Sequence, residues 1–112
     1  MTQCNVDNQQ LFDVSAAQLE AEKKLAATAK ALAHPARIRI LKILSDLEKA
    51  GGCLNSDLVS QLGLAQSTVS EHLRILKQAE LISAEPIPPK VCYRIRRQNI
   101  AGFSNLLLNN FN

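Results

Sequence analysis

Apolar residues recur at helical spacing along most of this chain, and the segment 54–83 carries two short stripes of this kind. The stripes consist of Leu58, Val59 and Leu62, and of Val69, Leu73 and Leu76. Gly63 stands between them, where a glycine in the left-handed conformation commonly ends a helix. Asn55 or Ser56 can cap the start of the first helix. The pattern therefore predicts two short amphipathic helices joined by a tight turn.

The outer face of the second helix, opposite its apolar stripe, is polar. Its side chains are those of Gln66, Ser67, Thr68, Ser70, Glu71 and Arg74. Short hydroxyl side chains let a helix approach the major groove of DNA closely, and Gln or Arg can form bidentate hydrogen bonds with purine edges. The alternative interpretation is the solvated face of an ordinary helical hairpin. The layout favours a helix-turn-helix that reads double-stranded DNA.

From residue 81 the pattern changes to the alternation of a β-hairpin. Residues 81–85 and 91–95 are strand-like. Pro86, Pro88 and Pro89 cannot sit in a central strand, so we expect them to form a rigid hairpin tip. A helix-turn-helix that is followed directly by such a hairpin is a winged helix.

Positive charge concentrates in this hairpin and beyond it. Residues 86–112 hold four basic side chains and no acidic one, whereas the formal net charge of the whole chain is +3. Lys90 and Arg94 belong to the second strand and its approach, and we expect them to contact DNA phosphates. Such contacts supply an affinity that depends on salt but not on the base sequence.

Three segments of the chain resemble the ArsR/SmtB family of small bacterial winged-helix repressors. They are AKALAHPARIRILKIL at 29–44, SDLVSQLGLAQSTVSEHLRILKQAELI at 56–82, and CYRI at the end of the hairpin. The resemblance covers roughly residues 25–100. It implies a homodimer that binds an inverted-repeat operator and is released by an inducer, often a metal or metalloid ion. Glu71 departs from the family, which usually has a basic or neutral residue there, and its carboxylate can accept a hydrogen bond from cytosine N4.

Length and composition agree with one small domain. The chain has 112 residues, of which 46% are hydrophobic, and it contains three Phe, one Tyr and no Trp. We expect a mainly helical fold with a small β-hairpin over residues 15–112, preceded by a mobile arm at residues 1–14. A core that is small and poor in aromatic side chains is expected to gain stability by dimerising.

The two ends of the chain supply the expected dimer contact. An Ala-rich helix is predicted at 15–33 with Leu19, Leu25, Ala29 and Leu32 on its apolar side, and the segment 99–111 holds Leu106, Leu107, Leu108 and Phe111. Two such helices that meet across a two-fold axis would separate the recognition helices by about one DNA turn, ~34–36 Å. The alternative is that both ends pack within one chain.

A second long helix is predicted from Pro35, which fits a first helical turn. Its expected core face consists of Ile38, Leu41, Leu44 and Leu47. His34 is interpreted as a helix-start residue and not as a ligand. His72 borders the apolar stripe of the recognition helix, so it is either a half-buried, hydrogen-bonded histidine or a DNA contact, for example to a phosphate.

The chain contains three cysteines, Cys4, Cys53 and Cys92. Because it shows no export signal, structural disulfides are not expected. Winged helices place a short first strand near Cys53, and that strand commonly pairs with the returning strand, which carries Cys92. We therefore predict that these two thiols lie close together although they are 39 positions apart in the sequence. Cys4 on the arm can approach them from the same subunit or from the other one.

Three converging thiolates would suit a soft, thiophilic ion, and As(III) or Sb(III) is the inducer that we favour. Two neighbouring thiols would equally suit reversible oxidation or persulfide chemistry on the same scaffold. A third interpretation is that Cys53 and Cys92 are small core residues. Two metal sites of the family are not expected, because Asn55 and Ser56 replace a Cys-x-Cys arrangement and residues 98–112 contain neither Asp nor His. No cofactor is expected to be required for folding.

Nothing in the sequence indicates catalysis, since no nucleophile lies in a recognisable setting and no Gly-rich phosphate loop is present. No stretch is long and apolar enough to span a membrane, and residues 1–10 lack the signature of a signal peptide. The expected location is the cytoplasm. A function from another class is also consistent with the pattern: a winged helix that binds a protein partner and does not read DNA.

Overall fold

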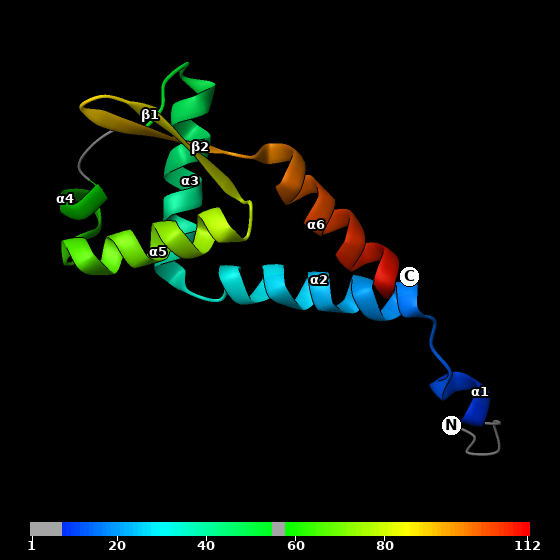
Figure 1. The fold of residues 1–112 in the computed structure, drawn as a ribbon. Coiled ribbons are helices and arrows are strands. Elements are labelled where there is room, and N and C mark those ends of the chain that lie inside the picture. The colour runs from blue at the N-terminus through cyan, green and yellow to red at the C-terminus, as the bar shows by residue number, and fades with distance from the viewer. Residues whose placement is uncertain (1–7, 55–57) are drawn as a thin grey trace, which may run out of the picture.

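The computed structural model describes residues 8–54 and 58–112, and it is mainly helical with one antiparallel hairpin (Figure 1). In chain order, the elements are α1 (Asn8–Phe12), α2 (Ala16–Leu32), α3 (Pro35–Lys49), α4 (Leu58–Leu62), α5 (Gln66–Gln78), β1 (Ile82–Ile87), β2 (Lys90–Ile95) and α6 (Arg97–Asn110). This order is that of a winged helix-turn-helix, so the predicted fold class is confirmed. Within the expected N-terminal arm, residues 8–12 form the short helix α1.

Helix α2 begins where the sequence indicates, because the side chain of Ser15 accepts a hydrogen bond from the backbone N–H of Gln18 at 3.1 Å. Ala31 is its buried residue, near the helix end. The predicted apolar side is only partly correct, since Leu19 is 44% exposed. The buried side of α2 is instead the one that packs against α3, α5 and α6.

Helix α3 starts at a well-defined cap. Nδ1 of His34 accepts a hydrogen bond from the backbone N–H of Ala36 at 3.0 Å, which confirms His34 as a helix-start residue. The buried face of α3 consists of Ile40, Leu41 and Leu44. The expected core position of Ile38 is wrong, because this side chain is 50% exposed. The inward face is rotated around the helix axis relative to the predicted stripe.

The helix-turn-helix consists of α4 and α5. Gly63 has a φ of +65°, so the turn uses the left-handed conformation that the sequence predicts at this position. In α5 the buried residues are Val69, His72 and Leu76, and Leu73 is half-buried beside them. The predicted start of the first helix at residues 55–56 lies outside the described residues.

The hairpin follows α5 directly. Its register pairs Ile82 with Ile95 at the base and Ile87 with Lys90 near the tip. The prediction that Pro86 belongs to the tip is wrong, since Pro86 lies in β1 opposite Val91. A proline is tolerated there because the sheet has two strands among the described residues, so β1 is an edge strand.

The short strand expected before the helix-turn-helix is reduced to a single bridge. The backbone N–H of Tyr93 donates to the carbonyl of Leu54 at 2.8 Å, and the N–H of Leu54 donates back to Tyr93 at 3.3 Å. This bridge holds the segment before α4 against β2.

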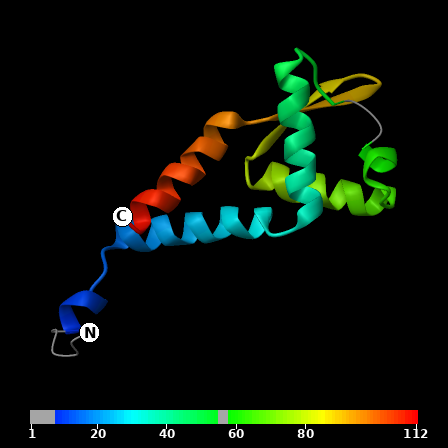
Figure 2. The same ribbon diagram turned by 180° about the vertical axis from the view of Figure 1, so that it is seen from behind.

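The core lies where α3 meets α5 and the hairpin. The fully buried side chains are those of Ile40, Leu44, Leu76, Leu81, Ile82 and Cys92. Both views show α3 running from the end of α2 to the hairpin (Figures 1 and 2). At the far side of the molecule α6 returns to α2, where Gln18 donates a hydrogen bond to Asn110 at 2.9 Å. The arrangement leaves the outer face of α5 open.

The core position of Leu44 leads to a stability prediction. Leu44→Ala removes a side chain that is 1% exposed and leaves a cavity, so we expect unfolding to become easier by about 2–5 kcal/mol. Urea denaturation followed by circular dichroism at constant protein concentration measures this difference. Lys42→Ala, which truncates an exposed side chain of the same helix, is the control and should leave the midpoint nearly unchanged. Equal midpoints for both variants would contradict the assigned core.

Candidate nucleic-acid interface and cysteine pair

The face of α5 that was predicted to read DNA is exposed. Its six side chains are those of Gln66, Ser67, Thr68, Ser70, Glu71 and Arg74, and all are classed as exposed. The buried stripe on the opposite side of α5 fixes the rotation of the helix, so these side chains face outward together. The structure thus brings the predicted recognition residues onto one accessible surface.

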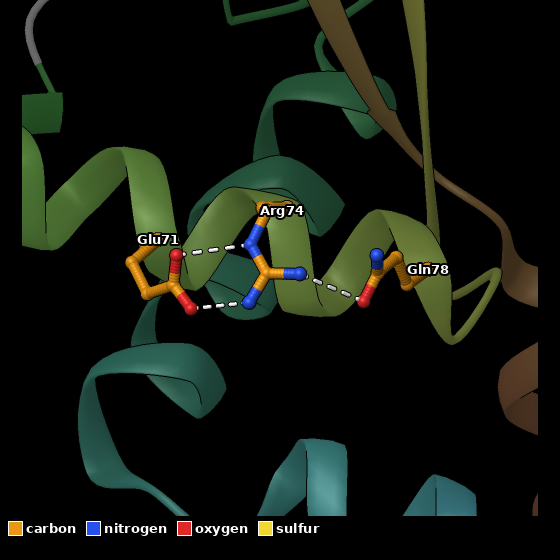
Figure 3. A network of polar contacts seen from close by, with 3 residues as sticks. All are labelled: Glu71, Arg74 and Gln78. Carbon is orange, nitrogen blue, oxygen red and sulfur yellow. Dashed lines mark hydrogen bonds and ion pairs between the residues drawn. The ribbon is translucent and has the colours of Figure 1, made fainter.

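Glu71, Arg74 and Gln78 form a network along this surface (Figure 3). Nε of Arg74 donates to Glu71 at 2.9 Å, a second guanidinium nitrogen donates to the other oxygen of the same carboxylate, and Nη1 donates to Gln78 at 3.0 Å. The hydrogen bond from Arg74 lowers the pKa of Glu71, and the same bond raises the pKa of Arg74. A DNA contact by either side chain therefore competes with this ion pair.

His72 is not on the outer face, which corrects its place among the predicted DNA contacts. The residue is only 7% exposed, and its ring lies 4.5 Å from the ring of His34, between centroids. Neither ring nitrogen has a hydrogen-bond partner within the described part of the chain, so the expected hydrogen-bonded histidine is also not observed. Burial, and then the nearby His34 and Arg37, lower the pKa of His72.

A groove separates α5 from the hairpin. It has a volume of about 340 Å³ and is lined by Ser70, Leu73, Arg74, Lys77, Ala84, Pro86, Val91 and Tyr93. Lys90 and Arg94 of β2 are both exposed, as predicted for phosphate contacts. Lys77 was missed in the sequence analysis, although its spacing of seven residues from Ser70 and three from Arg74 indicates the same face.

The two cysteines near the hairpin lie together. Cys53 and Cys92 form a disulfide, with their Cα atoms 5.8 Å apart, so the prediction that they are neighbours is confirmed. The expectation that no disulfide forms is contradicted. The reason is local: the antiparallel bridge between Leu54 and Tyr93 brings Cys53 and Cys92, the residues before them, into diagonal proximity, and Cys92 is 1% exposed.

The predicted third thiol, that of Cys4, lies outside the described residues. Across residues 8–54 and 58–112, no group of three or more His, Cys, Asp or Glu side chains is arranged to hold a metal ion. The described chain therefore offers two sulfur ligands, Cys53 and Cys92, and a three-thiolate site would need Cys4.

The elements α1, the start of α2 and the end of α6 lie at the same end of the molecule (Figures 1 and 2), and they carry large exposed apolar side chains. This terminal apolar surface consists of Leu11, Phe12, Val14 and Leu19 from the N-terminal part and Leu107, Leu108 and Phe111 from the C-terminal part. Phe12 and Phe111 are 75% and 78% exposed. Exposed apolar patches of this kind usually mark an interaction surface.

No helix among the described residues is long and apolar enough to cross a membrane.

Comparison with known proteins gives a consistent result. The model of the arsR family of bacterial regulatory proteins matches residues 34–84, which include α3, the helix-turn-helix and the start of the hairpin. The repressor SdpR of Bacillus subtilis is 32% identical over 83 residues, which cover 74% of this chain and 88% of SdpR. The regulator Rv0081 of Mycobacterium tuberculosis is 39% identical over 72 residues, which cover 64% of this chain and 60% of that relative.

Solved structures agree with the fold. The crystal structure of Rv0081 superposes with a TM-score of 0.59 at 29% identity and covers 87% of this chain and 89% of that one. A homodimeric winged helix-turn-helix DNA-binding domain from Mycobacterium bovis superposes with a TM-score of 0.65 at 24% identity, with 86% of each chain covered. At this identity the second likeness supports the fold alone.

The burial of His72 predicts a pH dependence of stability. Its pKa is lowered from 6.5 in the folded chain, so the unfolded chain binds a proton first as the pH falls. Stability should therefore be fully present above about pH 6.5 and decrease as the pH falls from there toward the folded pKa. The charged groups near the ring are His34, Arg37 and Glu71.

His72→Leu should reduce this loss, and urea midpoints at pH 7.5 and 5.5 measure it. His34→Asn keeps a helix-capping acceptor and removes only the smaller, electrostatic contribution of His34 to the lowered pKa of His72, so this comparison variant should retain most of the loss. A His72→Leu variant with the full wild-type pH dependence would show that other groups are responsible.

Proposed function

Because this chain belongs to the arsR family of bacterial regulatory proteins, we propose that it is a homodimeric transcriptional repressor that binds operator DNA under the control of the Cys53–Cys92 pair. The observation that carries the proposal is that the recognition face, the basic hairpin and the cysteine pair lie next to one another. An exposed polar recognition face lies beside a basic hairpin, and a disulfide joins that hairpin to the segment before the helix-turn-helix.

In this proposal α5 enters the major groove. The base contacts come from Gln66, Ser67, Thr68, Ser70, Glu71 and Arg74. Lys90 and Arg94 contact phosphates beside the groove, and they position the helix without reading sequence. His72 makes no DNA contact because it is buried.

The dimer forms through the terminal apolar surface, and its operator is an inverted repeat. Seven large exposed apolar side chains at one end of a small chain support this contact. A two-fold axis through that end gives two α5 helices with opposite orientation, which match two half-sites about one DNA turn apart, ~34–36 Å. The relative from M. bovis is described as a homodimer, which agrees with the proposal.

The first form of control is a reversible thiol switch, which the disulfide favours. Two thiols lose two protons and two electrons to an oxidant such as hydrogen peroxide, which becomes two water molecules, and a sulfur–sulfur bond forms. A reducing cytoplasm would hold the pair as thiols until an oxidant appears. Oxidation then ties β2 to the segment before α4 and changes operator affinity.

The second form of control is release of the operator by an inducer ion, As(III) or Sb(III). The two reduced sulfurs of Cys53 and Cys92 would bind the ion, and Cys4 would supply a third thiolate. The closeness of the first two cysteines supports this form as well. Its distinguishing requirement is Cys4, because the thiol switch needs only two sulfurs.

Fluorescence anisotropy tests the proposal. A labelled fragment from the gene's own upstream region is titrated with reduced protein, and hydrogen peroxide, arsenite, antimonite, zinc or cadmium is then added in separate samples. We expect tight binding of the reduced protein and release by at least one agent. Cys53→Ser/Cys92→Ser should abolish the response to every agent while DNA binding persists.

Cys4→Ser separates the two forms of control. Retained release by peroxide, reversed by dithiothreitol, assigns the thiol switch, whereas lost release by arsenite or antimonite assigns the three-thiolate site. An unchanged response in the double cysteine variant would refute the assignment of the pair. Absence of DNA binding, together with salt-independent capture of a protein partner, would favour a protein-binding winged helix.

The Glu71–Arg74 pair gives a prediction about specificity. Glu71→Gln removes a carboxylate that repels phosphate and frees Arg74, so we expect tighter binding to unrelated DNA. The ratio of operator affinity to unrelated-DNA affinity should fall about tenfold, because a base contact of Glu71 is lost. Competition anisotropy with both fragments measures this ratio.

Glu20→Gln is the matched control, since it removes an exposed carboxylate that pairs with Lys23 on α2. It should leave the specificity ratio unchanged. If Glu71→Gln and Glu20→Gln have the same ratio, Glu71 has no part in base selection.

A further inference from the structure

A cavity lined by basic side chains lies outside the helix-turn-helix and the hairpin. It has a volume of about 630 Å³ and is formed between α2, the start of α3 and the C-terminal end of α5. The cavity-lining charges are Lys24 and Lys30 of α2, Arg37 of α3 and Arg74 of α5, against one carboxylate, that of Glu80. The excess of positive charge suits an anionic ligand.

These basic groups are largely uncompensated inside the protein. Arg74 is paired with Glu71, but no carboxylate in the described parts of the chain lies within ion-pair distance of Lys24, Lys30 or Arg37. Two other exposed lysines of α2 and α3 are paired, Lys23 with Glu20 and Lys42 with Asp46. The cavity therefore gathers cations that have no acidic partner there.

Arg37 adds a second, independent observation. Its Nε atom is buried and has no hydrogen-bond partner among the described residues. A buried donor without an acceptor is costly, and a bound water or ion is one of the ways in which such a group is satisfied. A guanidinium group matches the oxygens of a phosphate particularly well, because its donors lie in one plane.

The position of the cavity favours DNA as the source of an anionic ligand. Arg74 and Gln78 line it, and both lie on the outer surface of α5 that carries the recognition residues (Figure 3). None of the residues of the terminal apolar surface lines it, so the proposed dimer contact does not use the same side chains. A DNA strand beside α5 would pass the mouth of this cavity.

We propose that this cavity binds a backbone phosphate of the operator, on the strand that borders the groove entered by α5. The inference rests on the proposed DNA binding and extends it to α2. In this arrangement Lys24, Lys30 and Arg37 form a phosphate clamp that is separate from Lys90 and Arg94 in the hairpin. The DNA-binding surface would thus extend to α2, the helix that also packs against α6.

The salt dependence of operator binding tests this clamp. Lys30→Gln and Lys24→Gln each remove one exposed positive charge, so neither is expected to unfold the chain. Loss of one phosphate contact per subunit should lower the slope of log affinity against log salt by about 0.9, or about 1.8 for a dimer. Lys23→Gln is the matched control, because Lys23 neighbours Lys24 on α2 but does not line the cavity.

We expect the slope of Lys23→Gln to equal that of the wild type, and phosphate-ethylation interference to disappear at one backbone position per half-site in Lys30→Gln. Wild-type operator binding with the same slope in all three variants would overturn the clamp and leave the proposed repressor function intact. Absence of wild-type DNA binding would overturn both.

A free anion is the competing occupant, and calorimetry with inorganic phosphate detects it. Saturable phosphate binding that is lost in Lys30→Gln, with an unchanged slope on DNA, would assign the cavity to a small anion and overturn the proposal.

Discussion

The packing of α3 against both α5 and the hairpin is the constraint on which the rest of the structure depends. Ile40 and Leu44 on one helix share a core with Leu76 of α5 and Ile82 of β1. Because one buried face supports both elements, the rotation of α5 and the position of the hairpin are fixed together. The recognition residues and the basic strand can therefore act as one surface.

That surface carries compensated and uncompensated charges side by side. Glu71 holds Arg74 along the helix, whereas Lys90 and Arg94 have no carboxylate within ion-pair distance among the described residues. Phosphate affinity needs free cations, but selection among bases needs groups with fixed direction. The network on α5 provides that direction, and the hairpin and the basic cavity on α2 provide the charge. Affinity and specificity are thus assigned to different residues.

Local signals account for what the sequence predicted well. Ser15, His34 and Gly63 each determine a helix end through their own backbone contacts, so those ends were found within about one residue. The failures depend on partners far along the chain. Ile38 satisfies a helical period but faces outward, and His72 lies on the buried side of α5, where its ring contacts that of His34, 38 positions earlier. Periodicity shows that a face is buried, but it does not show which neighbour buries it.

The cysteine pair lies where a small covalent change can reach the DNA surface. A hundredfold change in operator affinity corresponds to about 2.8 kcal/mol, which is comparable to two or three hydrogen bonds. Control requires only that one chemical state of the pair stabilise one conformation by that amount. The link between Cys53 and Cys92 acts on the segment that also carries the Leu54–Tyr93 bridge, immediately before α4. A shift of the hairpin relative to α4 that breaks a few phosphate contacts would therefore be sufficient, and the core around α3 need not rearrange.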